Sequence, residues 1–85
     1  MSLTDRSAQP RTLRAIAGEI QRDWGDKMYF GAVPYIRAMR GLEKITDKYG
    51  DEEGDRVVRY FLVNASTWRG DTARRVKAEL KGMLK

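Results

Sequence analysis

The first clear pattern in the chain is a series of apolar side chains spaced three and four residues apart, beginning after Thr12. Its members are Leu13, Ile16, Ala17, Ile20 and Trp24. At about 100° per residue these positions form one stripe of an α-helix. Gly25 follows the stripe and suits a helix C-cap. The pattern therefore predicts a first helix from Thr12 to Trp24.

A second stripe begins after Pro34, a residue that is tolerated at the first position of a helix. Its inner positions are Tyr35, Met39, Leu42, Ile45, Thr46 and Tyr49. Gly50 is expected to end this helix in the left-handed conformation. Residues 27–33 are largely apolar but lack a clear period, so we expect a packed connection between the first two helices.

A third helix is expected to begin at Asp51, a good N-cap that is followed by two glutamates suited to the positive end of the helix dipole. Its apolar positions are Val57, Val58, Phe61, Leu62, Ala65 and Trp68. Gly70 and then Asp71 indicate a stop and a restart. The fourth helix that follows would have an inner face of Ala73, Val76, Leu80, Met83 and Leu84.

No segment shows the strict alternation of apolar and polar residues that is typical of a half-buried strand. A chain of 85 residues has room for one small domain. The predicted fold class is therefore all-α, a compact bundle or orthogonal array of about four short helices. Residues 11–85 are expected to form this single helical domain. Residues 1–10, which are polar and without periodicity, are expected to form a flexible N-terminal arm.

The composition excludes most classes of enzyme. The chain has no cysteine and no histidine, so it lacks a thiolate nucleophile, the commonest general base and the commonest transition-metal ligand. The acidic segment 51–55 lacks the spacing of a calcium-binding EF-hand loop. We therefore expect that the protein is not an enzyme. We also expect that it has no catalytic residue, no metal site and no cofactor.

The apolar runs are too short for a membrane protein. The longest one considered, residues 60–63, is far below the roughly 20 residues that cross a membrane, and the N-terminus lacks the apolar segment of a signal peptide. These features indicate a cytoplasmic protein with no membrane partner.

The formal net charge is +5, and the basic excess is concentrated in residues 27–50 and 66–85. Two rows of basic residues follow from the predicted helices: Arg37, Arg40, Lys44 and Lys48 on the second, and Arg74, Lys77, Lys81 and Lys85 on the fourth, with Arg75 and Arg69 nearby. If these helices are neighbours, the rows form one surface that can bind the phosphates of a nucleic acid. The alternatives are that both rows are ordinary solvated helix faces, or that they bind an acidic protein partner.

The third and fourth helices also have the order of a DNA-binding helix-turn-helix motif, with Gly70 in the turn. That motif needs apolar residues beside the glycine, where this chain has Arg69 and Asp71, so the match is weak. In such a motif Arg74, Arg75 and Lys77 would face the major groove.

Most of the eight aromatic residues fall on inner stripes and are expected in the core. Tyr29 and Phe30, in the connection, and Tyr60 are the candidates for exposure. Trp68 and Arg69 together have the composition of a binding hot spot, although packing of the indole under Gly70 explains them equally well. The candidate partner-binding residues are therefore Trp68, Arg69, Tyr29 and Phe30.

Two runs, residues 29–39 (YFGAVPYIRAM) and 60–70 (YFLVNASTWRG), resemble runs in small proteins encoded by actinobacteriophages, including mycobacteriophages. The similar stretch extends from about Thr12 to Leu84. The resemblance implies an origin and a compartment, the cytoplasm of the infected bacterial host. It implies no catalytic residues, because these proteins have no assigned activity.

The sequence thus favours a non-enzymatic phage accessory protein that acts as a protein–protein interaction module on a host or phage protein. A homodimer is compatible with so small a core. The alternative is a basic helical protein that binds nucleic acid through the two basic rows.

Overall fold

The computed structural model describes residues 11–84, so the expected N-terminal arm, residues 1–10, lies outside the described residues. Within this range the chain forms the helices α2 (Leu13–Trp24), α3 (Val33–Arg40), α4 (Gly54–Val63) and α5 (Asp71–Met83). Two short 3₁₀ turns, Gly25–Lys27 and Phe30–Ala32, join α2 to α3, and a hairpin of β1 (Lys48–Tyr49) and β2 (Glu52–Glu53) precedes α4. The predicted all-α class is confirmed.

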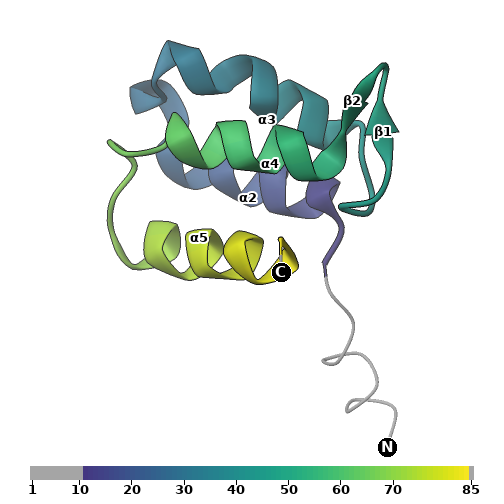
Figure 1. Ribbon diagram of the computed structural model, residues 1–85. Coiled ribbons are helices and arrows are strands. Elements are labelled where there is room, and N and C mark those ends of the chain that lie inside the picture. The colour runs from purple at the N-terminus through teal and green to yellow at the C-terminus, as the bar shows by residue number, and fades with distance from the viewer. Residues whose placement is uncertain (1–10, 85) are drawn as a thin grey trace, which may run out of the picture.

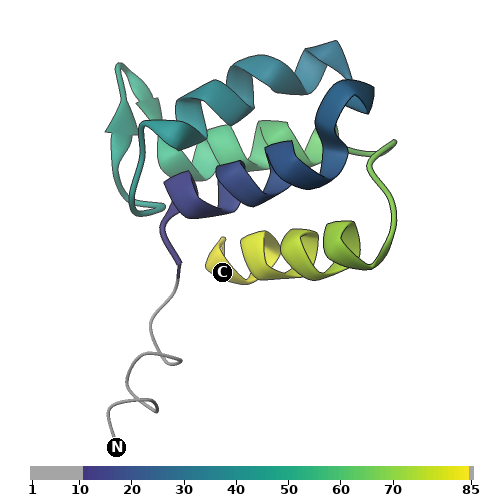
Figure 2. The same cartoon turned by 180° about the vertical axis from the view of Figure 1, so that it is seen from behind.

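The helices lie in a layered order that separates α3 from α5. Figures 1 and 2 show α3 and α5 on opposite sides of the molecule, with α2 and α4 between them. α3 packs against both α2 and α4, whereas α5 packs against α2. α3 and α5, which correspond to the predicted second and fourth helices, are therefore not neighbours. Basic residues on these two helices do not share a surface.

α2 and its ends agree with the prediction. The Thr12 hydroxyl accepts a hydrogen bond of 3.0 Å from the backbone N–H of Ala15, which caps the first turn. Gly25 ends the helix with φ at +58°, a conformation that side chains rarely adopt. The whole apolar stripe is buried. Both ends of α2 could be predicted from the sequence because the capping residues, Thr12 and Gly25, directly flank the helix.

α3 is shorter than predicted, and the expected helix to Tyr49 is wrong. The chain leaves the helix at Gly41, and the carbonyls of Leu42 and Glu43 accept hydrogen bonds of 3.0 and 2.9 Å from the first N–H groups of α2. The carboxylate of Asp47 also accepts hydrogen bonds from the N–H groups of Glu43 and Lys44. Such bonds compete with a helical backbone. The segment after Gly41 therefore accepts hydrogen bonds from the N-terminus of α2 instead of extending α3.

The hairpin replaces the expected N-cap at Asp51. Lys48 pairs with Glu53 and Tyr49 with Glu52, so Gly50 and Asp51 form a two-residue loop. Gly50 has φ at +62°, as predicted, but as the first loop residue of a hairpin, the glycine position of a type II′ turn. α4 begins only at Gly54, whose N–H donates a 2.7 Å hydrogen bond to the carbonyl of Asp47.

Three aromatic rings form the centre of the core. Trp24 stacks on Trp68 with ring centroids 5.7 Å apart, and both indoles meet Phe61 edge-on at 6.4 Å. α4 ends at Val63, five residues before the predicted end, and the turns that follow bring Ala65 and Trp68 into the core without a helix.

Ion pairs join α5 to α2 on one flank. Glu19 contacts both Arg11, at 2.8 Å, and Arg75, and Arg11 also makes a two-point contact with Glu79. The hydrogen bond from Arg75 is the main reason that the pKa of Glu19 lies below its ordinary value. The hydrogen bond to Glu79 likewise raises the pKa of Arg11. These contacts link α5 to α2 and to Arg11 just before it.

Candidate interaction surfaces

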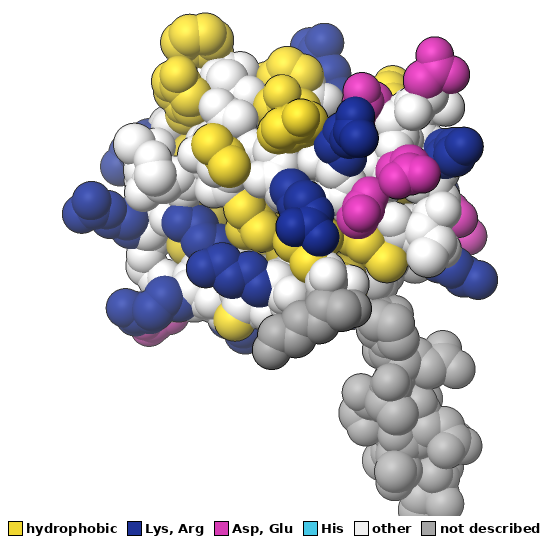
Figure 3. All heavy atoms as spheres, viewed as in Figure 1, with side chains coloured by type: hydrophobic (Ala, Val, Ile, Leu, Met, Phe, Trp, Pro, Cys, Tyr) yellow, Lys and Arg dark blue, Asp and Glu magenta, His cyan; other side chains and the backbone are white. Residues whose placement is uncertain are grey.

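Large apolar side chains gather at the end of the molecule where α3 begins and α4 ends. Their exposed fractions are 43% for Tyr29, 79% for Phe30, 46% for Tyr60 and 74% for Val63. We call these four residues the aromatic patch. Figure 3 shows hydrophobic side chains clustered over this end of α3 and α4. Single exposed apolar residues are ordinary, but a cluster marks an interaction surface.

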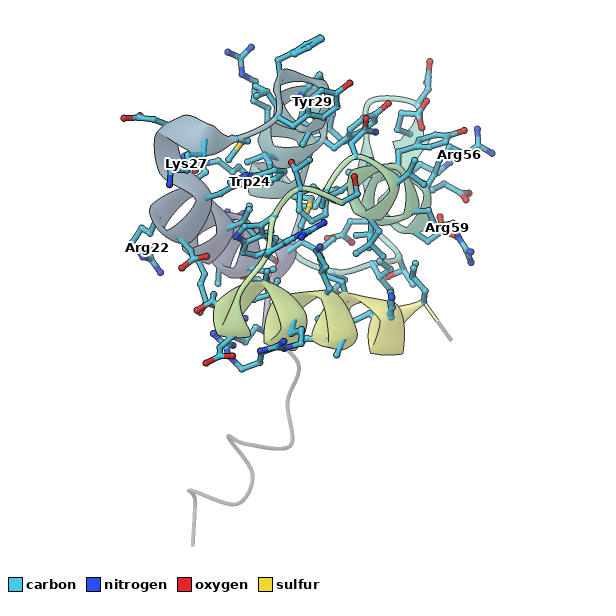
Figure 4. All side chains as sticks on the ribbon, turned by 90° about the vertical axis from the view of Figure 1, so that its left-hand side faces the viewer. Arg22, Trp24, Lys27, Tyr29, Arg56 and Arg59 are labelled. Carbon is cyan, nitrogen blue, oxygen red and sulfur yellow. The ribbon has the colours of Figure 1, made fainter. Side chains whose placement is uncertain are left out.

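Local contacts hold the two aromatic residues of the connection. The ring of Tyr29 lies 4.9 Å from that of Phe30, centroid to centroid. A side chain at Gly31 would collide with the Tyr29 ring at 2.5 Å and with the amide of Asn64 at 2.9 Å. The absence of a side chain at Gly31 therefore leaves room for the Tyr29 ring and for Asn64 at the end of α4. In Figure 4, Tyr29 lies close to this end of the molecule.

The α4 part of the patch follows from helical spacing. Tyr60 and Val63 are three residues apart, so they share one face of α4. The Tyr60 ring also packs against that of Tyr35 on α3, with centroids 5.7 Å apart. Asn64 donates a 2.8 Å hydrogen bond from its amide to the Tyr60 carbonyl, which closes the helix at the point where Tyr29 approaches. The patch is thus carried by two elements that pack together.

The structure divides the predicted partner-binding residues. Tyr29, Phe30 and Tyr60 are exposed, as predicted. Trp68 is not an exposed determinant, and that prediction is wrong: the indole is 2% exposed and donates a 2.8 Å hydrogen bond to Asp23. Arg69, the next residue, is exposed. The turn before Gly70 directs the indole inward and the guanidinium outward.

The predicted basic row of the second helix does not exist as a row. Arg37 and Arg40 lie on α3, whereas Lys44 lies in the connection after it and Lys48 in β1. The helical spacing that would align these residues ends at Arg40. The guanidinium of Arg40 instead donates a 2.6 Å hydrogen bond to the side chain of Gln21 on α2. The four residues are solvent-exposed but do not share a helix face.

The predicted row on the last helix divides into paired and unpaired cations. Arg74 pairs with Asp71, and Arg75 pairs with Glu19. Lys77 and Lys81 pair with no carboxylate in the part of the chain that the structure describes. A helix-turn-helix is also not formed, since residues 64–70 make a longer connection than the turn of about four residues in that motif.

Two exposed residues were missed by the sequence interpretation. Val63 was treated only as part of an apolar run, and Arg59 was not singled out. Both lie on α4 opposite its buried face of Val57, Val58 and Phe61. A helical wheel of residues 54–63 would have shown Val63 as an apolar residue outside the inner stripe. The signal was present, but it needed the true bounds of the helix.

Other classes of site find no support in residues 11–84. No group of three or more acidic side chains there is placed to hold a metal ion. No helix of the described segment is long and apolar enough to cross a membrane. Comparison of the chain with models of protein families, with curated proteins and with solved structures found no match. The resemblance to phage proteins therefore stays a prediction, and function is argued from the surfaces themselves.

Proposed function

We propose that the protein is a non-enzymatic binding module that docks onto another protein through the aromatic patch. The observation that supports this most directly is the exposure of Phe30 and Val63, at 79% and 74%, beside two half-exposed tyrosines. Interfaces are rich in aromatic residues at their centre, and a few such residues supply most of the binding energy. The partner would be a host or phage protein in the cytoplasm of an infected actinobacterium.

The charge beside the patch indicates the chemistry of the partner. Arg56, Tyr60 and Val63 are spaced by four and three residues, so they share one face of α4. Arg56 is exposed and forms no ion pair with any described residue. We therefore expect a partner with an apolar groove and an acidic rim. A symmetric dimer through this patch suits the site less well, because it would bring two Arg56 side chains together.

A matched pair of tyrosines tests the patch. Tyr60 and Tyr49 are 46% and 49% exposed, but Tyr49 lies on the hairpin beside Gly41, outside the patch. A partner is first captured from an actinobacterial lysate, identified by mass spectrometry and purified. Its affinity is then measured for the parent protein, Phe30→Ala, Tyr60→Ala and Tyr49→Ala. We expect Phe30→Ala or Tyr60→Ala to weaken binding about 30-fold, the effect of a 2 kcal/mol hot spot, and Tyr49→Ala to leave it unchanged.

Two results would contradict the proposal. One is equal binding by all four proteins, which would remove the patch from the interface. The other is a concentration-dependent dimer in sedimentation velocity that Phe30→Ala dissociates, which would make a second copy of the chain the partner. Circular dichroism of each variant shows whether the fold is intact.

A further inference from the structure

α5 separates its charges between two flanks. Arg75 and Glu79 lie on the flank that faces α2, where they pair with Glu19 and Arg11. Lys77 and Lys81, four residues apart, lie on the other flank, where Lys77 contacts the connection from α4. The first flank is neutralised within the protein. The second is not, since its lysines form no ion pair within residues 11–84.

Two exposed arginines on the preceding elements add to this charge: Arg69 lies near Lys77, and Arg59 on α4 lines a pocket with Glu53, Asp55 and Arg56. Arg69 is exposed in the connection, next to Trp68, whose carbonyl accepts a 2.7 Å hydrogen bond from the ammonium of Lys77. Arg59 lies on the exposed side of α4, three residues before the half-buried Leu62. Figure 3 shows Lys and Arg side chains gathered over α4 and α5 on this face, with acidic side chains concentrated toward the hairpin.

The lysines and Arg69 are close enough to repel one another. Burial, and then the charges of Lys81 and Arg69, hold the pKa of Lys77 below its ordinary value. Lys77 nevertheless remains fixed against the Trp68 carbonyl at 2.7 Å. A group of cations held together without anions is relieved when an external anion binds, because the repulsion is then screened.

We infer that Arg59, Arg69, Lys77 and Lys81 form a binding surface for the phosphate backbone of nucleic acid, which we call the α4–α5 basic surface. The spacing of the cations indicates the class of ligand. Several separated cations on one face match the successive phosphates of a nucleic acid better than they match a single small anion. The surface would bind without base specificity, since it offers charge rather than a helix placed in a groove. This inference does not depend on the aromatic patch, because it uses none of its residues.

The experiment is a fluorescence-anisotropy titration of a labelled DNA duplex and a labelled single strand at salt concentrations from about 50 to 200 mM. Neutralisation of four phosphates on duplex DNA predicts a slope of about −3.6 in log K against log salt, or about a 150-fold loss of affinity over this range. We expect Lys81→Gln and Arg59→Gln each to reduce the slope by about one. Lys77→Gln is avoided as the main test because it also removes the hydrogen bond to Trp68.

Arg22→Gln is the matched control. Arg22 is exposed, forms no ion pair in the described part of the chain, and lies on the opposite side of the molecule from Arg59 in Figure 4. It removes the same charge, so an unchanged slope for Arg22→Gln and a reduced one for Lys81→Gln support the surface. No DNA binding at the lowest salt, or equal loss in all three variants, would overturn it. So would binding to heparin without binding to DNA, or loss of DNA binding in Phe30→Ala alone.

Discussion

The indole N–H of Trp68 donates a 2.8 Å hydrogen bond to the carboxylate of Asp23, which joins the connection before α5 to the end of α2. The Trp68 ring also stacks on Trp24, and the Trp68 carbonyl accepts a hydrogen bond from the ammonium of Lys77. Trp68 is therefore held on both its side chain and its backbone. Trp68, predicted as part of a binding hot spot, instead links α2 to α5.

Loss of this anchor should destabilise the fold. Trp68→Ala removes a buried ring and leaves a cavity, so we expect the free energy of unfolding to fall by about 3–5 kcal/mol. Asp23→Ala leaves the ring but removes the acceptor of its N–H, which costs about 1–3 kcal/mol. Urea unfolding followed by circular dichroism measures both. Asp26→Ala, at an exposed position in the turn after α2, is the control, and a similar loss in that variant would refute the role of the hydrogen bond.

The elements that the sequence predicts well are those whose signals are local. α2 has its cap at Thr12 and its stop at Gly25, and α5 begins after Gly70, which has φ at +112°. The end of α3 has no such signal. It is set by bonds from the carbonyls of Leu42 and Glu43 to the start of α2, a contact between segments far apart in the chain.

The interaction surfaces divide in the same way. The exposure of Tyr29 and Phe30 was predictable because they lie outside every apolar stripe. Two signals in the sequence bear on Trp68: its place on an apolar stripe favoured burial, and its position beside Arg69 favoured an exposed hot spot. The contacts with Trp24 and Asp23, far away along the chain, bury it. The basic row of the second helix was predicted on a helix that was too long, so Lys44 and Lys48 fall outside α3, which ends at Arg40.

Glu19 should make stability depend on pH in the acid range. Its folded pKa is held below the ordinary value of 4.5, first by the hydrogen bond from Arg75 and also by Arg11. The unfolded chain therefore binds a proton more readily, so this contribution is fully present above pH 4.5 and is lost as pH falls through the lower folded pKa. We expect Glu19→Gln to be less stable than the parent at pH 7. The difference in unfolding free energy should shrink toward pH 3, the acid range in which paired carboxylates become protonated.

The matched control for that titration is Glu52→Gln, because Glu52 is exposed in β2 and forms no ion pair within residues 11–84. Its unfolding free energy should follow that of the parent at both pH values. A constant difference between parent and Glu19→Gln from neutral to acid pH would mean that the carboxylate charge is not what stabilises the α2–α5 contact.

The aromatic patch should contribute little to folding. Phe30 and Val63 are mostly exposed, so replacing both with serine removes few contacts of the native state. We expect the free energy of unfolding of the double variant to change by no more than about 0.5 kcal/mol. Binding of an apolar fluorescent dye to the folded protein should fall at the same time. A large loss of stability would show that the patch belongs to the core and would undermine its assignment as a docking surface.

Two glycines in helices should respond in opposite directions to alanine. A Cβ at Gly54 would lie 2.6 Å from the carbonyl oxygen of Ile45, so the backbone of the preceding connection must move. We expect Gly54→Ala to lower the free energy of unfolding by about 1–3 kcal/mol, the usual cost of overpacking. A Cβ at Gly82, in the last turn of α5, meets nothing within 4 Å. Gly82→Ala should therefore stabilise the protein by up to about 1 kcal/mol through helix propensity. Thermal unfolding of the two variants decides the matter, because stabilisation by Gly54→Ala would mean that the connection does not cross the start of α4 as closely as described.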